Sequence, residues 1–160
     1  MFAPDPGRVT LEDAVVLEQA KTEDARGILE LLERSRLPLD GLMDHLATTI
    51  VARHDGRIVG SAALEMYQGA ALLRSVAVDP ALQGRGLGRE LTEAALRLAR
   101  KLRVSDVYLL TTTAATFFPK FGFREITRDA VPAAVKTSVE FTTACPASAT
   151  VMRVATADHG

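Results

Sequence analysis

The sequence of 160 residues has a single cysteine, Cys145, no excess of either charge, and no apolar run near the roughly 20 residues that cross a bilayer. A single cysteine excludes an intramolecular disulfide, which agrees with a reducing compartment. The formal net charge of −1 argues against a general nucleic-acid-binding protein, because such proteins neutralise phosphates with an excess of lysine and arginine. We therefore expect neither a nucleic acid nor a membrane as a partner.

The first residues also lack the basic start and the apolar core of a signal peptide, so we expect a cytoplasmic protein. Residues 1–12 carry three Pro and Gly residues without periodicity, and we expect a flexible N-terminal tail there. No repeat or linker interrupts the rest, which predicts a single domain at 13–156. Three scattered histidines and one cysteine, with no Cys-x-x-Cys, predict no metal site.

Hydrophobic periodicity predicts strands alternating with helices along the chain. We expect strands at 14–20, two or three within 48–78, then 106–112, 123–128 and 149–156, and helices at about 22–35, 42–47, 86–102 and 114–122. The helix at 86–102 joins two neighbouring strands, and a crossover of this length makes that pair parallel. The remaining hairpins are antiparallel. The predicted fold class is α/β (α+β): a mixed, mostly antiparallel sheet with helices on both faces.

Three glycines stand at the start of the helix expected at 86–102: Gly84, Gly86 and Gly88. Their spacing matches neither the P-loop nor the dinucleotide-binding fingerprint. The first N–H groups of a helix have no partner inside it and carry the positive end of the helix dipole. Glycines let an anion approach this backbone, and Arg85 and Arg89 add positive charge. We expect a pyrophosphate-like group here; the alternative is a tight turn that binds nothing.

The stretch SVAVDPALQGRGLGREL resembles the acetyl-CoA-binding signature of the GCN5-related N-acetyltransferases, the GNAT family, in an apolar strand, a Val-x-Pro step and a Gln-x-x-Gly-x-Gly turn. The resemblance extends over about 13–156 and implies the GNAT fold, in which one parallel strand pair splays apart. It implies acetyl-CoA as co-substrate. The pantetheine arm would pair with the backbone of 76–78, and the pyrophosphate would lie on the amides of 84–89. The implied cofactor-binding residues are Val76, Ala77, Val78, Gln83, Gly84, Arg85, Gly86, Leu87, Gly88, Arg89, Thr112 and Phe118.

The stretch LLTTTAATFFPKFGF resembles the next motif of the family, with one departure. Phe118 stands where relatives often have a tyrosine that protonates the leaving thiolate. Either another acid serves, or the thiolate leaves unprotonated. The same stretch also resembles the acetyltransferase domain of N-acetylglutamate synthase. RLPLDGL and EFTTACPASA resemble N-acetyltransferases of arsenic-resistance operons. Both resemblances imply an amino-acid-like acceptor.

The implied reaction is direct attack of a primary amine on the thioester, which requires a base, an oxyanion donor and close placement of the reactants. The strand that often carries the family's base has no acidic residue between Gln68 and Val78. We expect Glu65 to be the base, against the alternative of a surface glutamate, with Glu140 as the second candidate. The backbone N–H of Val76 is the expected oxyanion donor.

Arg74 interrupts an apolar strand, and a guanidinium there needs a carboxylate partner. That partner is either Glu65, in a structural ion pair, or a substrate carboxylate. Thr111 and Lys136 are the other expected acceptor-binding residues, although threonine also simply favours strands. The predicted function is an N-acetyltransferase that forms a ternary complex with acetyl-CoA and a small amine. The alternatives are a protein or antibiotic N-acetyltransferase and a non-catalytic acyl-CoA sensor. The sequence itself does not indicate the oligomeric state, and the resemblance to the family implies a homodimer as one option.

Overall fold

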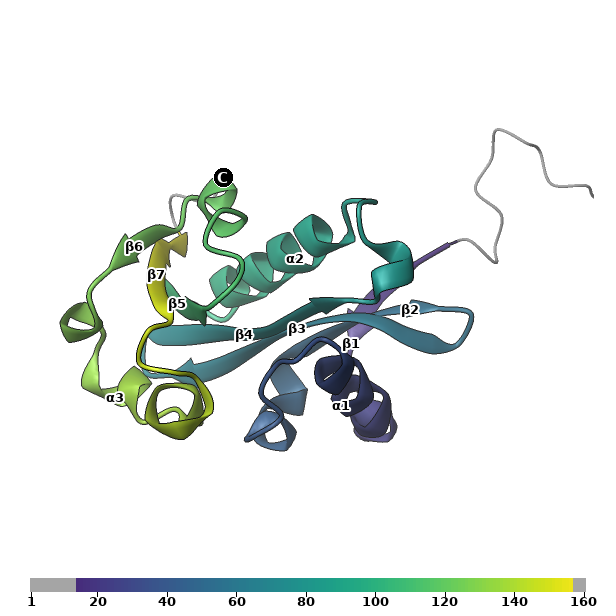
Figure 1. Cartoon of the computed structure of the whole chain (residues 1–160), viewed down its shortest axis with the longest axis horizontal. Helices are drawn as coiled ribbons and strands as arrows, with labels where there is room; N and C mark the ends of the chain where they lie inside the picture. The colour runs from purple at the N-terminus through teal and green to yellow at the C-terminus, as the bar shows by residue number, and fades with distance from the viewer. Residues whose placement is uncertain (1–13, 157–160) are drawn as a thin grey trace, which may run out of the picture.

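The computed structural model describes residues 14–156, which form a seven-stranded mixed sheet (Figure 1). The strands lie in the order β1-β2-β3-β4-β5-β7-β6, and every neighbouring pair is antiparallel except β4 and β5. Their bounds are β1 Val16–Gln19, β2 Thr49–His54, β3 Arg57–Tyr67, β4 Ala70–Val78, β5 Asp106–Thr111, β6 Arg124–Ile126 and β7 Thr150–Ala155. The predicted fold class is confirmed. The predicted tail at 1–12 lies outside the described residues.

Helices cover both faces of the sheet, as the amphipathic patterns predict. α2 (Leu87–Lys101) packs its leucines and alanines on one face, and α1 (Ala25–Arg34) and α3 (Ala133–Lys136) lie on the other (Figure 1). Short helical turns complete the chain: η1 Thr22–Asp24, η2 Leu42–Thr48, η3 Pro80–Leu82, η4 Phe118–Phe121, η5 Arg128–Ala130 and η6 Glu140–Ala144. Two of them, η2 and η4, lie where helices were expected at 42–47 and 114–122, although both are 3₁₀ turns and η4 is shorter than expected. The turns η3, η5 and η6 were not predicted, because a turn this short shows no repeat.

β4 and β5 separate after a short region of contact. Only Ala70–Leu72 pair with Asp106–Tyr108, so the rest of β4 has no partner on β5. α2 connects the two strands, and its Leu91 packs so tightly on β3 that a Cβ at Gly60 would lie 2.8 Å from Leu91 Cδ1. The backbone of residues 73–78 is therefore open toward the gap between the strands.

A β-bulge lies in this open part of β4. Ser61 pairs with Ala77, but Ala63 pairs with Arg74, which leaves Ser75 and Val76 without registered partners on β3. Ser75 has a φ of 60°, a conformation that costs a non-glycine residue free energy and that recurs at functional sites. The Ser61 hydroxyl donates a 2.6 Å hydrogen bond to the Ser75 carbonyl and helps to hold this shape. The bulge re-aims the strand at the point where it lines a cavity.

Candidate active site

A cavity of about 930 Å³ occupies the gap between the separated ends of β4 and β5. The bulged part of β4 forms one wall, and the end of β5 with η4 forms the opposite one. The turn that contains Gly84 and Gly86, called the glycine turn from here on, closes one end. At the other end lie the loop after α1 and the segment from Glu140 to Pro146. Unpaired strand backbone, a helix N-terminus and an elongated space thus meet in one place.

The glycine turn has the conformation that its composition predicts. Gly84 and Gly86 have φ values of 85° and 81°, and a Cβ at either position would meet nothing within 4 Å. α2 begins at Leu87, so only Gly88 lies within the helix, where a Cβ would make ordinary contact with Phe117. Of the three glycines expected at the start of the helix, two therefore precede it in left-handed turns that glycine favours.

The N-terminus of α2 suits a pyrophosphate. Its first N–H groups have no acceptor within the helix, and the open space above Gly84 and Gly86 admits an anion to them. The Arg89 side chain lines the cavity, whereas Arg85 is exposed and does not line it. Most of the expected cofactor-binding residues also line the cavity: Val76, Ala77, Val78, Gln83, Gly84, Gly86, Leu87, Gly88, Arg89, Thr112 and Phe118. Their roles toward acetyl-CoA stay predictions, and the shape and chemistry of the cavity fit that group.

η4 supplies an aromatic wall. Phe118 is buried and packs edge-on against Phe117, with ring centroids 5.1 Å apart, and against Phe123 at 5.7 Å. It lines the cavity without a hydroxyl to donate. Thr111 also lines the cavity, but its hydroxyl oxygen accepts a 2.9 Å hydrogen bond from the Ala114 backbone and so stabilises the turn after β5.

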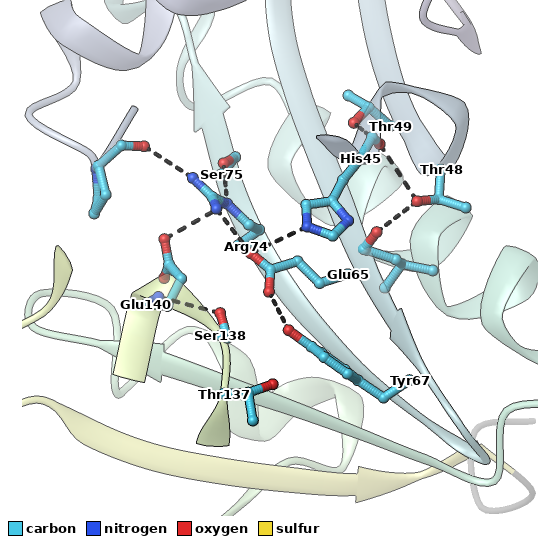
Figure 2. A network of polar contacts seen from close by, with 12 residues as sticks. His45, Thr48, Thr49, Glu65, Tyr67, Arg74, Ser75, Thr137, Ser138 and Glu140 are labelled. Carbon is cyan, nitrogen blue, oxygen red and sulfur yellow. Dashed lines mark hydrogen bonds and ion pairs between the residues drawn. The ribbon is translucent and has the colours of Figure 1, made fainter. Parts of the chain in front are cut away.

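Arg74 is the centre of a buried polar network (Figure 2). Its Nη1 donates to Glu65 Oε2 at 2.8 Å, its Nη2 to the Pro38 carbonyl at 3.2 Å and its Nε to Ser75 Oγ at 3.1 Å. The expected ion pair with Glu65 is confirmed, and neither side chain is more than 1% exposed. The buried guanidinium thereby joins β4 to β3 and to the loop after α1, and Arg74 is one of the residues that line the cavity.

Glu65 lies behind Arg74 and does not line the cavity. Its Oε1 accepts a 2.7 Å hydrogen bond from the Tyr67 hydroxyl. His45 Nε2 lies 3.8 Å from its Oε2, the oxygen that also contacts Arg74. Burial acts to raise the pKa of Glu65. The Ser138 hydroxyl, Arg74 and Tyr67 outweigh burial and lower that pKa below its ordinary value. A carboxylate committed in this way favours the ion-pair interpretation of Glu65 over the predicted role as base.

The other carboxylate beside Arg74 belongs to Glu140, and it does line the cavity. Its Oε2 lies 3.5 Å from Arg74 Nε. Burial raises the pKa of Glu140, and the charges of Glu65 and Asp40 add to this effect; Arg74 acts in the opposite direction without cancelling it. By contrast, Lys136, at the end of α3, does not line the cavity.

Several cavity residues were not predicted from the sequence. Arg36 lines the cavity with a φ of 59°, at the end of α1, where the Leu37 N–H donates to the Leu32 carbonyl at 2.9 Å. Helices commonly end in this way with a glycine in the left-handed position, so an arginine there is unusual. Cys145 is half-buried and also lines the cavity, which nothing in its local sequence indicates.

Two general properties of the described residues also bear on function. No helix within 14–156 is long and apolar enough to cross a membrane. In the same range, no group of three or more His, Cys, Asp or Glu side chains is arranged to hold a metal ion.

Comparison with known proteins places this fold and cavity in a family. A family model described as an acetyltransferase (GNAT) domain matches residues 45–125. An amino-acid acetyltransferase of Mycobacterium tuberculosis is 32% identical over 130 residues, covering 75% of this chain and 74% of that one.

Solved structures agree with this match. A Mycobacterium tuberculosis protein in complex with CoA and NLQ is 28% identical with a TM-score of 0.74, covering 88% of this chain and 98% of that one. N-acetylglutamate synthase from Neisseria gonorrhoeae, complexed with coenzyme A and N-acetyl-glutamate, shares the fold at 23% identity with a TM-score of 0.76, covering 89% of this chain and 35% of that one. The chain therefore belongs to the GNAT family of acetyltransferases, enzymes that use acetyl-CoA as co-substrate.

Proposed function

We propose that the chain transfers the acetyl group of acetyl-CoA to the primary amine of a small, amino-acid-like acceptor. The observation that carries this proposal is the composition of the cavity end away from the glycine turn. Arg36 and Arg74 lie there together with the carboxylate of Glu140. The exposed Arg36 offers a cation for an acceptor carboxylate, the buried Arg74 adds positive charge behind the wall, and Glu140 offers an anion for the ammonium group. The relatives named amino-acid acetyltransferases support the same acceptor class.

Distance along β4 supports the division of the cavity into donor and acceptor ends. Arg74 lies four residues before Val78; a fully extended strand would span roughly 13 Å there, and the bulge at Ser75 shortens this distance. We propose that the pantetheine arm pairs with the backbone of 76–78, between the pyrophosphate on the glycine turn and the reacting centre. The thioester would then lie near the bulge, where Ser75 and Val76 have no strand partner.

The proposed reaction is a direct transfer in a ternary complex. The amine loses a proton, its lone pair attacks the thioester carbonyl, the C–N bond forms and the C–S bond breaks. The Val76 N–H is the proposed hydrogen-bond donor to the carbonyl oxygen as that oxygen gains charge. Phe118 has no proton to give, so the sulfur leaves as a thiolate or takes the proton that the nitrogen loses.

A thiol-release assay with acetyl-CoA and a panel of amines tests the proposal. The panel holds L-amino acids including glutamate, their decarboxylated amines, phosphonic and arsonic analogues, an aminoglycoside, and a peptide with a free N-terminus and lysine. We expect turnover of one or more amino acids. Loss of the acceptor carboxylate should lower kcat/KM about 10- to 100-fold, because it removes hydrogen bonds to charged groups.

The other outcomes decide between the alternatives. Turnover of only the peptide or the aminoglycoside would replace the small-acid proposal with a protein or antibiotic acceptor. CoA binding without turnover of any amine would favour a sensor, although membership of an acetyltransferase family supports an enzyme. The arsonic analogue addresses the resemblance to arsenic-resistance enzymes, which stays a prediction, as does the homodimer.

A further inference from the structure

We infer that Glu140 accepts the proton of the acceptor's ammonium group, and that Arg74 and Glu65 hold it in position. The inference rests on the proposed function only in that the acceptor is an amine. It assigns the base to a residue on the segment before β7 and not to a residue of β3 or β4.

The hydrogen bonding of Glu140 is incomplete in a way that marks a binding group. The side chain is 5% exposed. Its Oε1 accepts a hydrogen bond from Cys145 Sγ at 3.4 Å, whereas its Oε2 accepts no hydrogen bond from any described residue. Buried carboxylate oxygens almost always have a donor, because an unsatisfied one costs free energy. An ammonium group in the adjoining cavity would supply the missing donor.

The backbone fixes Glu140 at this place. Its N–H donates to the Ser138 hydroxyl at 3.1 Å, and the Cys145 N–H donates back to the Glu140 carbonyl at 3.1 Å, which closes the turn η6. Glu140 and Cys145 both line the cavity. The carboxylate therefore stands on a closed turn at the cavity wall, and small movements of the loop do not carry it away.

Charge balance points to the same ligand. Glu65 and Glu140 lie on either side of Arg74, so these three side chains carry one negative charge in excess when both acids are ionised (Figure 2). His45, whose Nε2 lies 3.8 Å from Glu65 Oε2, adds a positive charge only when it is protonated. Tyr67 and Cys145 do not change this sum at neutral pH, because the pKa of each is raised to about 12, mainly by burial. A protonated amine neutralises the excess charge, and it arrives in that form at neutral pH.

The two carboxylates differ in suitability as a base. Burial raises the pKa of Glu140, and the negative charges of Glu65 and Asp40 add to that effect against the lowering by Arg74. A base whose pKa approaches the working pH removes a proton more effectively. The pKa of Glu65 is instead lowered, and Glu65 has no contact with the cavity.

The proton step balances without another reagent. The ammonium N–H bond breaks, the proton moves to Glu140 Oε2, and the freed lone pair forms the C–N bond as the C–S bond breaks. The nitrogen then loses its second proton to the departing sulfur or to water, and Glu140 returns its own proton to water. The products are the N-acetyl compound, CoA thiol and one proton.

The test compares Glu140→Gln with Glu65→Gln and with Glu33→Gln, an exposed carboxylate on α1. The substrate is whichever amine the wild type turns over, so failure of the amino-acid proposal leaves this test intact. Steady-state rates are measured from pH 6 to 10. We expect Glu140→Gln to lower kcat about 100- to 1,000-fold at pH 7.5, with the KM for acetyl-CoA unchanged.

The pH profile separates a base from a structural residue. In the wild type, kcat/KM should rise with pH as Glu140 ionises; this rise is the acid limb of the profile. Glu140→Gln should lose the acid limb, and its deficit in rate relative to the wild type should shrink above the pKa of the amine, where the amine is already neutral. Glu65→Gln should keep the limb and move it to lower pH, since a like charge is removed. Glu140→Asp should restore the limb with a reduced kcat. This variant keeps the test valid if Glu140→Gln fails to fold.

Two results would overturn the inference. One is a Glu140→Gln enzyme within threefold of the wild type at pH 7.5, or with the same deficit at every pH. The other is an acid limb that disappears in Glu65→Gln and persists in Glu140→Gln, which would identify Glu65 as the base. Circular-dichroism melting and CoA affinity confirm that each variant is folded before its rates are compared.

Discussion

Replacement of Arg74 by methionine removes the one cation between two buried carboxylates. Arg74 has a fully buried side chain, and the carboxylates of Glu65 and Glu140 lie 2.8 and 3.5 Å from its nitrogens. Methionine has similar length and no charge, so the packing volume is largely kept. The variant therefore tests the electrostatics of the network more than its packing.

The expected loss is large because both carboxylates lose their buried counter-ion. Removal of one member of a buried ion pair typically destabilises a protein by about 3–5 kcal/mol. Arg74 also donates to the Pro38 carbonyl, which is left without this donor. For a chain of this length about 1 kcal/mol corresponds to 2–4 °C in Tm, so Arg74→Met should melt about 10 °C below the wild type near pH 8.

The loss should depend on pH, and its sign follows from the two carboxyl groups. Arg74 lowers the pKa of both Glu65 and Glu140, and in its absence both values rise in the folded state. A folded-state pKa above the ordinary value of 4.5 stabilises the fold only while the group is protonated. That stability is present below pH 4.5 and is lost as the pH rises through the folded-state pKa. The deficit of Arg74→Met should therefore be greater at pH 8 than at pH 5.

Urea unfolding at pH 5 and pH 8 measures both quantities. Arg97→Met on the exposed face of α2 is the matched control, and it should change the free energy of unfolding by less than about 0.5 kcal/mol at either pH. A deficit in Arg74→Met under about 1 kcal/mol at pH 8 would refute the reasoning. So would a deficit that is equal at the two pH values or larger at pH 5.

Further predictions concern the glycines and the end of α1. Gly86→Val should weaken CoA binding at least tenfold by calorimetry and cost about 1–2 kcal/mol of stability. Gly56→Val, at a similar positive φ in the β2–β3 hairpin, should cost about as much stability and leave CoA affinity unchanged. Gly60→Ala should destabilise the protein by about 1–3 kcal/mol in urea, because its Cβ would lie 2.8 Å from Leu91 Cδ1; an unchanged midpoint would contradict this packing. Arg36→Gly should raise stability by about 1 kcal/mol, since glycine relieves the φ of 59°, and a loss would show that the side chain stabilises the fold.

Local patterns predicted most of the secondary structure. The Asp-Gly pair between β2 and β3 forms a turn with Asp55 and Gly56 at positive φ. The leucines and alanines that recur every three or four residues after the glycine turn form the buried face of α2. These features depend on residues close in sequence, so the sequence contains them. The crossover helix predicted that β4 and β5 are parallel, which is confirmed, whereas the order of the remaining strands was not predicted.

The candidate site was predicted unevenly for the same reason. The glycine turn and β4 supply cavity residues from one continuous stretch, and these were found. Arg36, Cys145 and Pro146 come from loops, and nothing local places them at the cavity. Arg85 carries the right charge but is exposed outside the cavity wall, as one residue of a tight turn readily is.

The sequence alone predicted a site for a pyrophosphate-like group, because helix N-terminus, glycines and strand are contiguous and their chemistry is backbone chemistry; acetyl-CoA as the ligand came from the family resemblance. The relation between the acids needed the folded chain. Glu65 and Glu140 are 75 positions apart, and both contact Arg74, one behind the cavity wall and one at its surface. Burial and charge in three dimensions, which no spacing encodes, lower the pKa of one carboxyl and raise that of the other.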